Sequence, residues 1–175
     1  MHKAIWATLT LVVAFAPTVL EAQGRLRVRT LNRSDRIIAD TMGQAYEVPG
    51  SPARVFRAVS EVFAELKMET PIRDSAMLEV GNEKFFKRGD FAGRRISGLL
   101  ECGGGLTGLY ADNHRVDLSL VTFVRPVEAN VSTIRTVLLG AAINVTEGVK
   151  PPQFCRSNGE LERMIHQRVT KRLQM

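Results

Sequence analysis

The 175-residue chain lacks the features that mark specialised protein classes. It has only two cysteines, so no disulfide framework holds it together, and outside residues 4–16 it has no long apolar run typical of a multi-spanning membrane protein. Internal repeats and low-complexity tracts are absent. What remains is ordinary globular composition, 45% hydrophobic and 24% charged, at a length that suits a single domain burying about 70% of its unfolded surface.

The amino-terminal segment has the layout of a signal peptide. Met1, His2 and Lys3 form a short cationic start, residues 4–16 are apolar, and a proline follows. This apolar run is too short to span a bilayer, which needs ~20 residues. We therefore expect cleavage near Ala22, export to the periplasm or the medium, and no transmembrane segment in the mature chain.

The mature chain keeps its net charge of +6, because residues 1–22 contain one basic residue and one acidic residue. Both cysteines, Cys102 and Cys155, lie in the mature part. Since an exported protein meets an oxidising compartment, we expect them to form one disulfide, with free buried thiols as the alternative.

The rest of the pattern predicts an α+β fold. Residues 23–44 form an Arg-rich arm, either flexible or an edge strand, and residues 45–175 form one domain. A strand at 46–48 precedes a helix that starts at Ser51, whose hydroxyl is a capping candidate, and Pro52. The apolar stripe of this helix is Val55, Phe56, Val59, Val62, Phe63 and Leu66.

Strands are expected at 77–83 and 94–102, and a hairpin at 115–125 and 131–142, followed by a loop at 144–156. Ser157 and Glu160 have the spacing of a capping box, and an apolar stripe follows at Leu161, Met164, Ile165, Val169 and Leu173. The order of strand, helix, strands and helix predicts an antiparallel sheet of about five strands with both helices on one face.

No pattern identifies a reaction. Gly103, Gly105 and Gly108 match the dinucleotide fingerprint, but a strand pattern rather than a helix follows them, so we interpret them as a turned loop. The mature chain has only His114 and His166, too few for a recognisable metal set, and no nucleophile elbow is present. We expect no cofactor, and enzymatic activity is the weakest of the functional hypotheses.

Residues 84–95 are the most informative surface candidate, because they interleave cations with aromatic residues in an expected loop. Such a loop could bind an anionic envelope component, a membrane surface or an acidic protein, whereas nucleic acid is not expected after export. Alternatively, the phenylalanines anchor the loop in the core and the cations are merely solvated. The candidate binding residues are Lys84, Phe86, Lys87, Arg88, Phe91, Arg94 and Arg95.

From Tyr46 onward, the chain resembles a group of uncharacterised exported bacterial proteins with no known activity. The residues that carry the resemblance are Val80-Gly81-Asn82, Cys102-Gly103, Gly108, Ala111-Asp112, Cys155, Ser157, Gly159, Leu161 and Glu162. It implies a bacterial envelope setting and no chemistry. Separately, residues 48–56 resemble the opening of helix-grip domains that bind lipids and metabolites.

Two functions follow from these observations. The leading hypothesis is a non-enzymatic binding or interaction domain of the cell envelope that uses residues 84–95. The alternative is a carrier whose small ligand or lipid lies between the sheet and the final helix.

Overall fold

A computed structural model describes residues 27–29, 36–38, 42–145 and 151–175. The signal peptide predicted at 1–22 lies outside the described residues. The expected α+β class is confirmed, with a seven-stranded antiparallel sheet in place of the expected five strands. The strands of this sheet run in the order β4 (Ile72–Asp74), β5 (Glu79–Lys87), β11 (Arg115–Glu128), β12 (Val131–Ile143), β13 (Gln153–Ser157) and β8 (Leu100–Glu101), and β3 (Ala45–Pro49) also pairs with β12.

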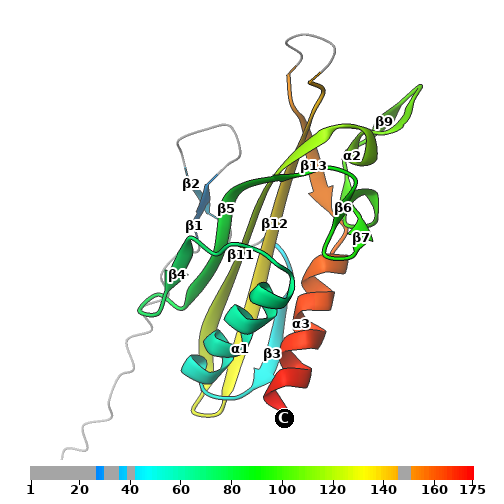
Figure 1. Ribbon diagram of the computed structural model, residues 1–175. Coiled ribbons are helices and arrows are strands. Elements are labelled where there is room, and N and C mark those ends of the chain that lie inside the picture. Colours follow the sequence, from blue (N-terminus) through cyan, green and yellow to red (C-terminus); the bar gives the residue numbers. More distant parts are fainter. Residues whose placement is uncertain (1–26, 30–35, 39–41, 146–150) are drawn as a thin grey trace, which may run out of the picture.

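The two long helices, α1 (Pro52–Glu65) and α3 (Glu160–Leu173), pack against each other and against one face of the sheet, as expected (Figure 1). Alternate side chains of a strand share a face, and the even-numbered residues of β11 lie on the face that the two helices cover. Leu118, Leu120 and Val124 are at most 1% exposed there. This layer of sheet and helices forms the main core.

The β11–β12 hairpin is the centre of the sheet. The antiparallel hairpin expected at 115–125 and 131–142 is confirmed, and its register runs from Arg115 opposite Ile143 to Glu128 opposite Val131. The far face of the hairpin carries a smaller apolar cluster around Val121, Phe123 and Val137. From the Arg-rich arm, β1 (Arg27–Arg29) pairs with β2 (Arg36–Ile38), and β1 lies against β11.

The segment expected to be one strand at 94–102 is broken. It contains β7 (Arg94–Arg95), a 3-10 turn at Ile96–Gly98, and β8. Ile96, Leu99 and Leu100 are all buried, which is a spacing that a continuous strand with alternating faces cannot satisfy. Before it, β5 extends to Lys87 and β6 (Asp90–Phe91) pairs with β7, so residues 84–95 are largely strand and tight turn rather than a loop.

The region expected to be a loop at 144–156 contains β13, which pairs with β12 over residues 140–142 and then with β8. A strand this short has too few alternating positions to stand out in the sequence, and its pairing comes from distant segments. The remaining short elements are β9 (Gly104–Gly105), β10 (Gly108–Leu109) and α2 (Tyr110–Asn113). No helix among the described residues is long and apolar enough to cross a bilayer.

Candidate functional site

Residues 84–95 divide into a buried side and an exposed side. Phe91 is only 5% exposed and its ring lies 5.4 Å from that of Phe85, so this aromatic pair anchors the segment in the core. Phe86, by contrast, is 63% exposed. The central guanidinium carbon of Arg115 lies over its ring, 5.7 Å from the centre of that ring. The aromatic side chain that remains available to a partner is Phe86.

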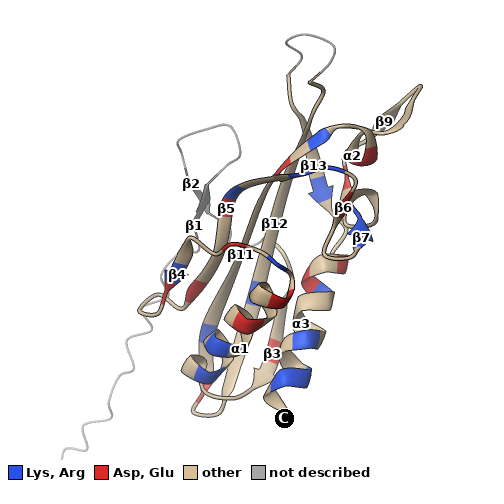
Figure 2. Cartoon of the chain, in the orientation of Figure 1, with Lys and Arg blue, Asp and Glu red and all other residues tan. Residues whose placement is uncertain are grey.

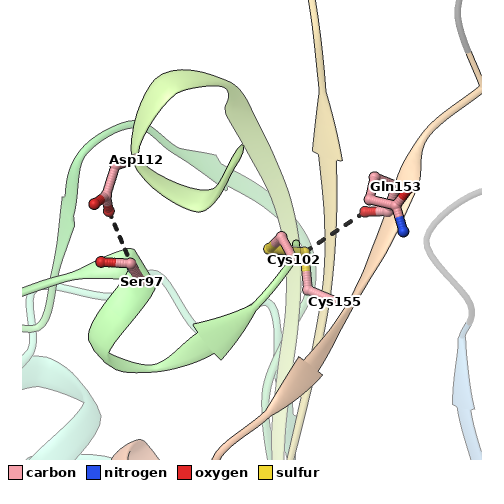
Figure 3. The surroundings of a disulfide bond; sticks show 5 residues. All are labelled: Ser97, Cys102, Asp112, Gln153 and Cys155. Atoms are coloured by element: carbon pink, nitrogen blue, oxygen red, sulfur yellow. Dashed lines mark hydrogen bonds between the residues drawn. A yellow bond between two sulfur atoms is a disulfide. The ribbon is translucent and has the colours of Figure 1, made fainter. Parts of the chain in front are cut away.

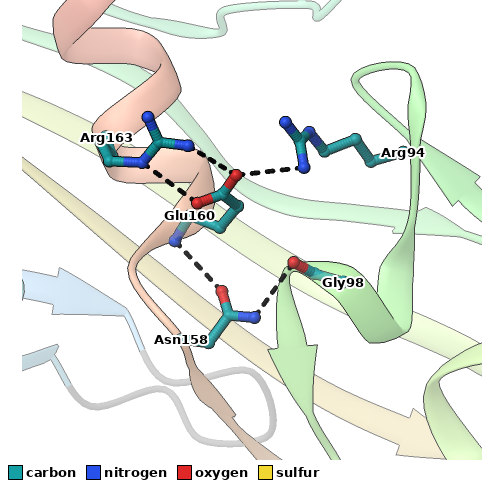
Figure 4. A network of polar contacts seen from close by, with 5 residues as sticks. All are labelled: Arg94, Gly98, Asn158, Glu160 and Arg163. Carbon is teal, nitrogen blue, oxygen red and sulfur yellow. Dashed lines mark hydrogen bonds and ion pairs between the residues drawn. The ribbon is translucent and has the colours of Figure 1, made fainter.

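The cations of this segment are partly engaged within the molecule. Arg94 forms an ion pair of 3.0 Å with Glu160 at the start of α3, and Figure 4 shows Arg163 holding the same carboxylate from the other side. The guanidinium of Arg95 lies 3.8 Å from the Asp112 carboxylate. The ammonium of Lys87 lies 5.8 Å from the centre of the Phe91 ring. Basic and acidic residues therefore alternate along the ribbon at this end of the molecule, as the colours in Figure 2 show.

The disulfide predicted between Cys102 and Cys155 is confirmed, with an S–S distance of 2.05 Å (Figure 3). It joins the residue that follows β8 to the middle of β13, across 53 positions of sequence. Cys102 is buried, and Gly140 of β12 lies directly against Cys155. The bridge thereby fixes the place where β13 leaves β12 and turns toward α3.

A pocket opens where β3 and β13 share one edge of β12 without meeting. The register of β3 ends at Arg135 and that of β13 begins at Gly140, so residues 136–139 are paired with neither strand. The resulting edge pocket has a volume of about 280 Å³. It is lined by Met42, Gly43, Gln44, Tyr46, Val137, Leu138, Leu139, Cys155, Arg156, Ser157, Gly159 and Glu162.

Glu162 is the unusual side chain of the edge pocket. It is only 3% exposed, and one carboxylate oxygen, Oε1, accepts a hydrogen bond of 2.6 Å from the hydroxyl of Ser157. The other oxygen, Oε2, is buried and has no hydrogen-bond partner. Burial raises the pKa of Glu162, against the lowering effects of the Ser157 hydrogen bond and of its own main-chain N–H. A buried carboxylate oxygen without a donor carries a desolvation cost, which is the physical reason why burial raises this pKa.

The capping box expected at Ser157 and Glu160 is therefore wrong. The residue at the N-cap of α3 is Gly159, which has a φ of +82°. Asn158 accepts the Glu160 N–H at 3.1 Å through its side-chain oxygen, while its amide donates to the carbonyl of Gly98 at 3.0 Å (Figure 4). Ser157 is thereby left to hold Glu162. The hydroxyl of Ser51, the other predicted cap, likewise makes no capping hydrogen bond, although Pro52 does begin α1.

One wall of the edge pocket is held by an aromatic stack. The ring of Tyr46 lies parallel to that of His166, with centroids 4.3 Å apart and planes at 11°. His166 follows Glu162 by one turn of α3 and so lies on the same side of the helix. Burial lowers the pKa of His166, and a hydrogen bond to the main chain of Glu47 opposes this effect. Burial therefore favours the neutral form of the imidazole that packs against the tyrosine.

The space directly beneath α3 is filled by side chains. Leu161, Ile165 and Val169 are each 0% exposed, and the edge pocket lies beside the amino-terminal end of the helix rather than under it. A larger hollow of about 450 Å³ lies between α1 and the β6–β7 turn. Its lining includes the basic residues Lys67, Lys87 and Arg168 together with the acidic residues Glu65 and Asp90.

The remaining sequence motifs form no site in the described part of the chain. The glycines at 103–108 shape the β9–β10 hairpin, and the helix after it, α2, is a single turn, unlike a dinucleotide-binding motif. His114 stacks on Tyr110 at 4.9 Å. No group of three or more metal-ligating side chains occurs among the described residues.

The sequence did not identify Glu162 as a functional candidate. As an acidic residue in the first turn of a helix, it complements the helix dipole, which gives no reason to assign it a function. The signal that could have identified it is its position within the buried face, directly after Leu161 and one turn before Ile165. Comparison of the chain with protein-family models, with curated proteins and with solved structures gives no match.

Proposed function

We propose that this protein is an exported, non-enzymatic domain that binds a small ligand in the edge pocket. The observation that carries the proposal is the edge pocket itself, a hollow of about 280 Å³ whose lining places the largely buried side chain of Glu162 among apolar residues. In ligand sites, a few polar groups placed among apolar walls fix the orientation of the ligand. Here the walls are Met42, Tyr46 and Leu139, and the polar group is the carboxylate.

Export is supported by two independent features of the chain. The segment 1–22 has the charge and apolar pattern of a cleaved leader, and the two cysteines form a disulfide of the kind that persists in oxidising compartments. Intact mass analysis of protein from its native host should give a mature amino terminus near Gln23 and oxidised cysteines. A retained leader with reduced thiols would contradict export.

Binding is tested by native mass spectrometry of the protein purified from its host. The expected result is an added ligand mass that is lost on denaturation and is strongly reduced in Glu162→Gln. Glu160→Gln is the matched control, because Glu160 lies in the same helical turn but pairs with Arg94 and Arg163 outside the pocket. Wild-type protein that always has the mass of the polypeptide alone would overturn the proposal.

A second candidate function is binding of an anionic envelope surface or acidic partner through residues 84–95. The observation that favours it is the exposure of Phe86 beside Lys84 and Arg88 at the end of β5. Charge reversal of Lys87, Arg88, Arg94 and Arg95 to Glu should abolish salt-sensitive binding to phosphatidylglycerol vesicles. Because Arg94 also pairs with Glu160, Lys84→Glu combined with Arg88→Glu is the cleaner variant. Unchanged binding would exclude this surface.

A further inference from the structure

The hollow of about 450 Å³ lies where three separate elements bring basic side chains together. Lys67 directly follows α1, Lys87 ends β5, and Arg168 belongs to α3. These residues are distant in the sequence, so only the fold places them around one space, which we call the basic hollow. It shares no lining residue with the edge pocket, so the two sites can be tested separately.

One of the two acidic residues in this lining already has cations beside it. Glu65 binds the guanidinium of Arg172 through Oε1, and its Oε2 lies 4.0 Å from a guanidinium nitrogen of Arg168. Arg172 is not part of the lining, so it offsets the Glu65 carboxylate from outside the hollow. Glu65 therefore does not cancel the charge of the two lysines.

The lysines have no such counter-charge. Among the residues that the structure describes, neither Lys67 nor Lys87 forms an ion pair, and the ammonium of Lys87 lies 5.8 Å from the centre of the Phe91 ring. Asp90, the second acidic residue of the lining, is exposed and likewise forms no ion pair in the described part of the chain. Positive charge is thus in excess in the basic hollow, and a bound anion would balance it.

The backbone is unusual at the same place. Three non-glycine residues of the described chain have a positive φ, and two of them, Lys67 at +53° and Ala92 at +55°, line the basic hollow. Lys67 directly follows the C-cap of α1, and the next N–H, that of Met68, donates to the carbonyl of Phe63. Glycine is the usual residue at this position of a helix end. Lysine is strained there, yet it supplies a cation to the hollow, and such strain is often found at functional sites.

The basic hollow also has apolar walls. Leu66 and Phe91 are 9% and 5% exposed, and Ala92 contributes a methyl group. The volume lies within the range of ligand pockets, about 300–1,000 Å³, and exceeds what a single anionic group fills. The lining therefore suits a ligand in which an apolar group is attached to an anionic one.

We infer that the basic hollow binds a phosphate monoester that carries an apolar group. A monoester has a charge of about −1.5 to −2 at pH 7 and three acceptor oxygens, which suits three cations. A carboxylate has a single charge and two oxygens, so it matches them less well. The same chemistry occurs in soluble phosphate esters and in phosphatidic acid at a membrane surface, and the experiment distinguishes these two sources.

The test is calorimetric titration of the mature protein at pH 7 and constant ionic strength with phenyl phosphate, phenylacetate and inorganic phosphate. Phenyl phosphate should bind about tenfold more tightly than phenylacetate, which has the same ring but a single charge. It should also bind more tightly than inorganic phosphate, which lacks the ring. No binding of phenyl phosphate, or equal binding of phenylacetate, would overturn the inference.

Sedimentation with phosphatidylcholine vesicles that contain phosphatidic acid identifies the source of the phosphate. Vesicle binding that phenyl phosphate displaces assigns the basic hollow to the lipid headgroup. Binding of phenyl phosphate without binding to the vesicles assigns it to soluble esters.

Variants separate specific recognition from a general loss of structure. Lys87→Gln should weaken binding of phenyl phosphate by about tenfold. Lys171→Gln is the matched control, because it removes the same charge from an exposed position of α3 outside the lining, and it should bind like the wild type. Asp90→Asn should bind more tightly, because it removes a repulsive charge, and a loosened structure would not produce this gain.

Lys67→Gly tests the strained position directly. It should weaken binding without lowering the melting temperature, because glycine adopts the left-handed conformation freely. Unchanged affinity for phenyl phosphate in both Lys67→Gly and Lys87→Gln would exclude the basic hollow as the binding site.

Discussion

Ser157 donates its hydroxyl to Glu162 across the turn that leads from β13 into α3, at 2.6 Å. The same hydroxyl oxygen accepts the N–H of Gly159 at 3.1 Å, so Ser157 connects the strand, the helix cap and the buried carboxylate. Through this hydrogen bond the carboxylate keeps a fixed orientation, with Oε1 satisfied and Oε2 left without a partner. Preorganised polar groups of this kind lower the cost of ordering a binding site when a ligand arrives.

Glu162→Gln should change the pH dependence of stability. Because burial raises the pKa of Glu162 above 4.5 in the folded state, the unfolded chain releases this proton first, and stability falls as pH rises from 4.5 through the folded pKa. The glutamine variant should lack this fall. Urea denaturation between pH 4 and pH 8 measures it, and parallel stability curves for the two proteins would contradict the raised pKa.

His166→Phe should reduce the loss of stability below pH 7. The pKa of His166 is lowered below 6.5 in the folded state, so the unfolded chain binds the proton first and stability is lost as pH falls from 6.5 through the folded pKa. Phenylalanine keeps a ring against Tyr46 but cannot be protonated. The variant should therefore lose less stability than the wild type between pH 7 and pH 5 in the same denaturation experiment. An equal loss would show that this imidazole does not control the acid response.

Removing the disulfide should destabilise the protein by about 4 kcal/mol on the chain-entropy model for a loop of 53 residues. Cys102→Ser combined with Cys155→Ser, compared with the oxidised wild type in urea, gives this difference in the free energy of unfolding. Chemically reduced wild type is the control, because it loses the bridge without a change of side chain. Because Cys155 also lines the edge pocket, ligand binding should weaken with the bridge removed. A loss of stability below about 1 kcal/mol would contradict the role assigned to the bridge.

Gly43→Ala and Gly89→Ala form a matched pair with nearly equal φ angles. Their φ angles are +70° and +71°, so alanine carries similar backbone strain at both positions, about 1–2 kcal/mol. Only at Gly43 would the new Cβ collide with a main-chain carbonyl, whereas nothing lies within 4 Å at Gly89. Gly43→Ala should therefore cost about 1–3 kcal/mol more than Gly89→Ala. Equal unfolding free energies would show that the chain before β3 does not pass against Thr136.

Much of the fold could be predicted because its strongest elements carry their periodicity locally. The apolar stripes of α1 and α3 and the alternation along β11 each identify a secondary structure without reference to the rest of the chain. Pro52 at the first position of α1 marks a boundary for the same local reason. The pairing of the cysteines followed from their number, since a single pair allows a single bridge.

The candidate site could not be predicted, because its parts come from segments that meet only in the folded chain. β13 is a strand because it pairs with β12 and with β8. Residues 136–139 of β12 pair with neither β3 nor β13, because the register of β3 ends at Arg135 and that of β13 begins at Gly140. Glu162 is buried because Ser157 and the sheet edge surround it. Sequence alone therefore determined the helices, the central hairpin and the single possible bridge, through local periodicity and composition. Only tertiary structure decided where a strand edge stays open and which carboxylate lies beside it, because pairing and desolvation depend on residues distant in the chain.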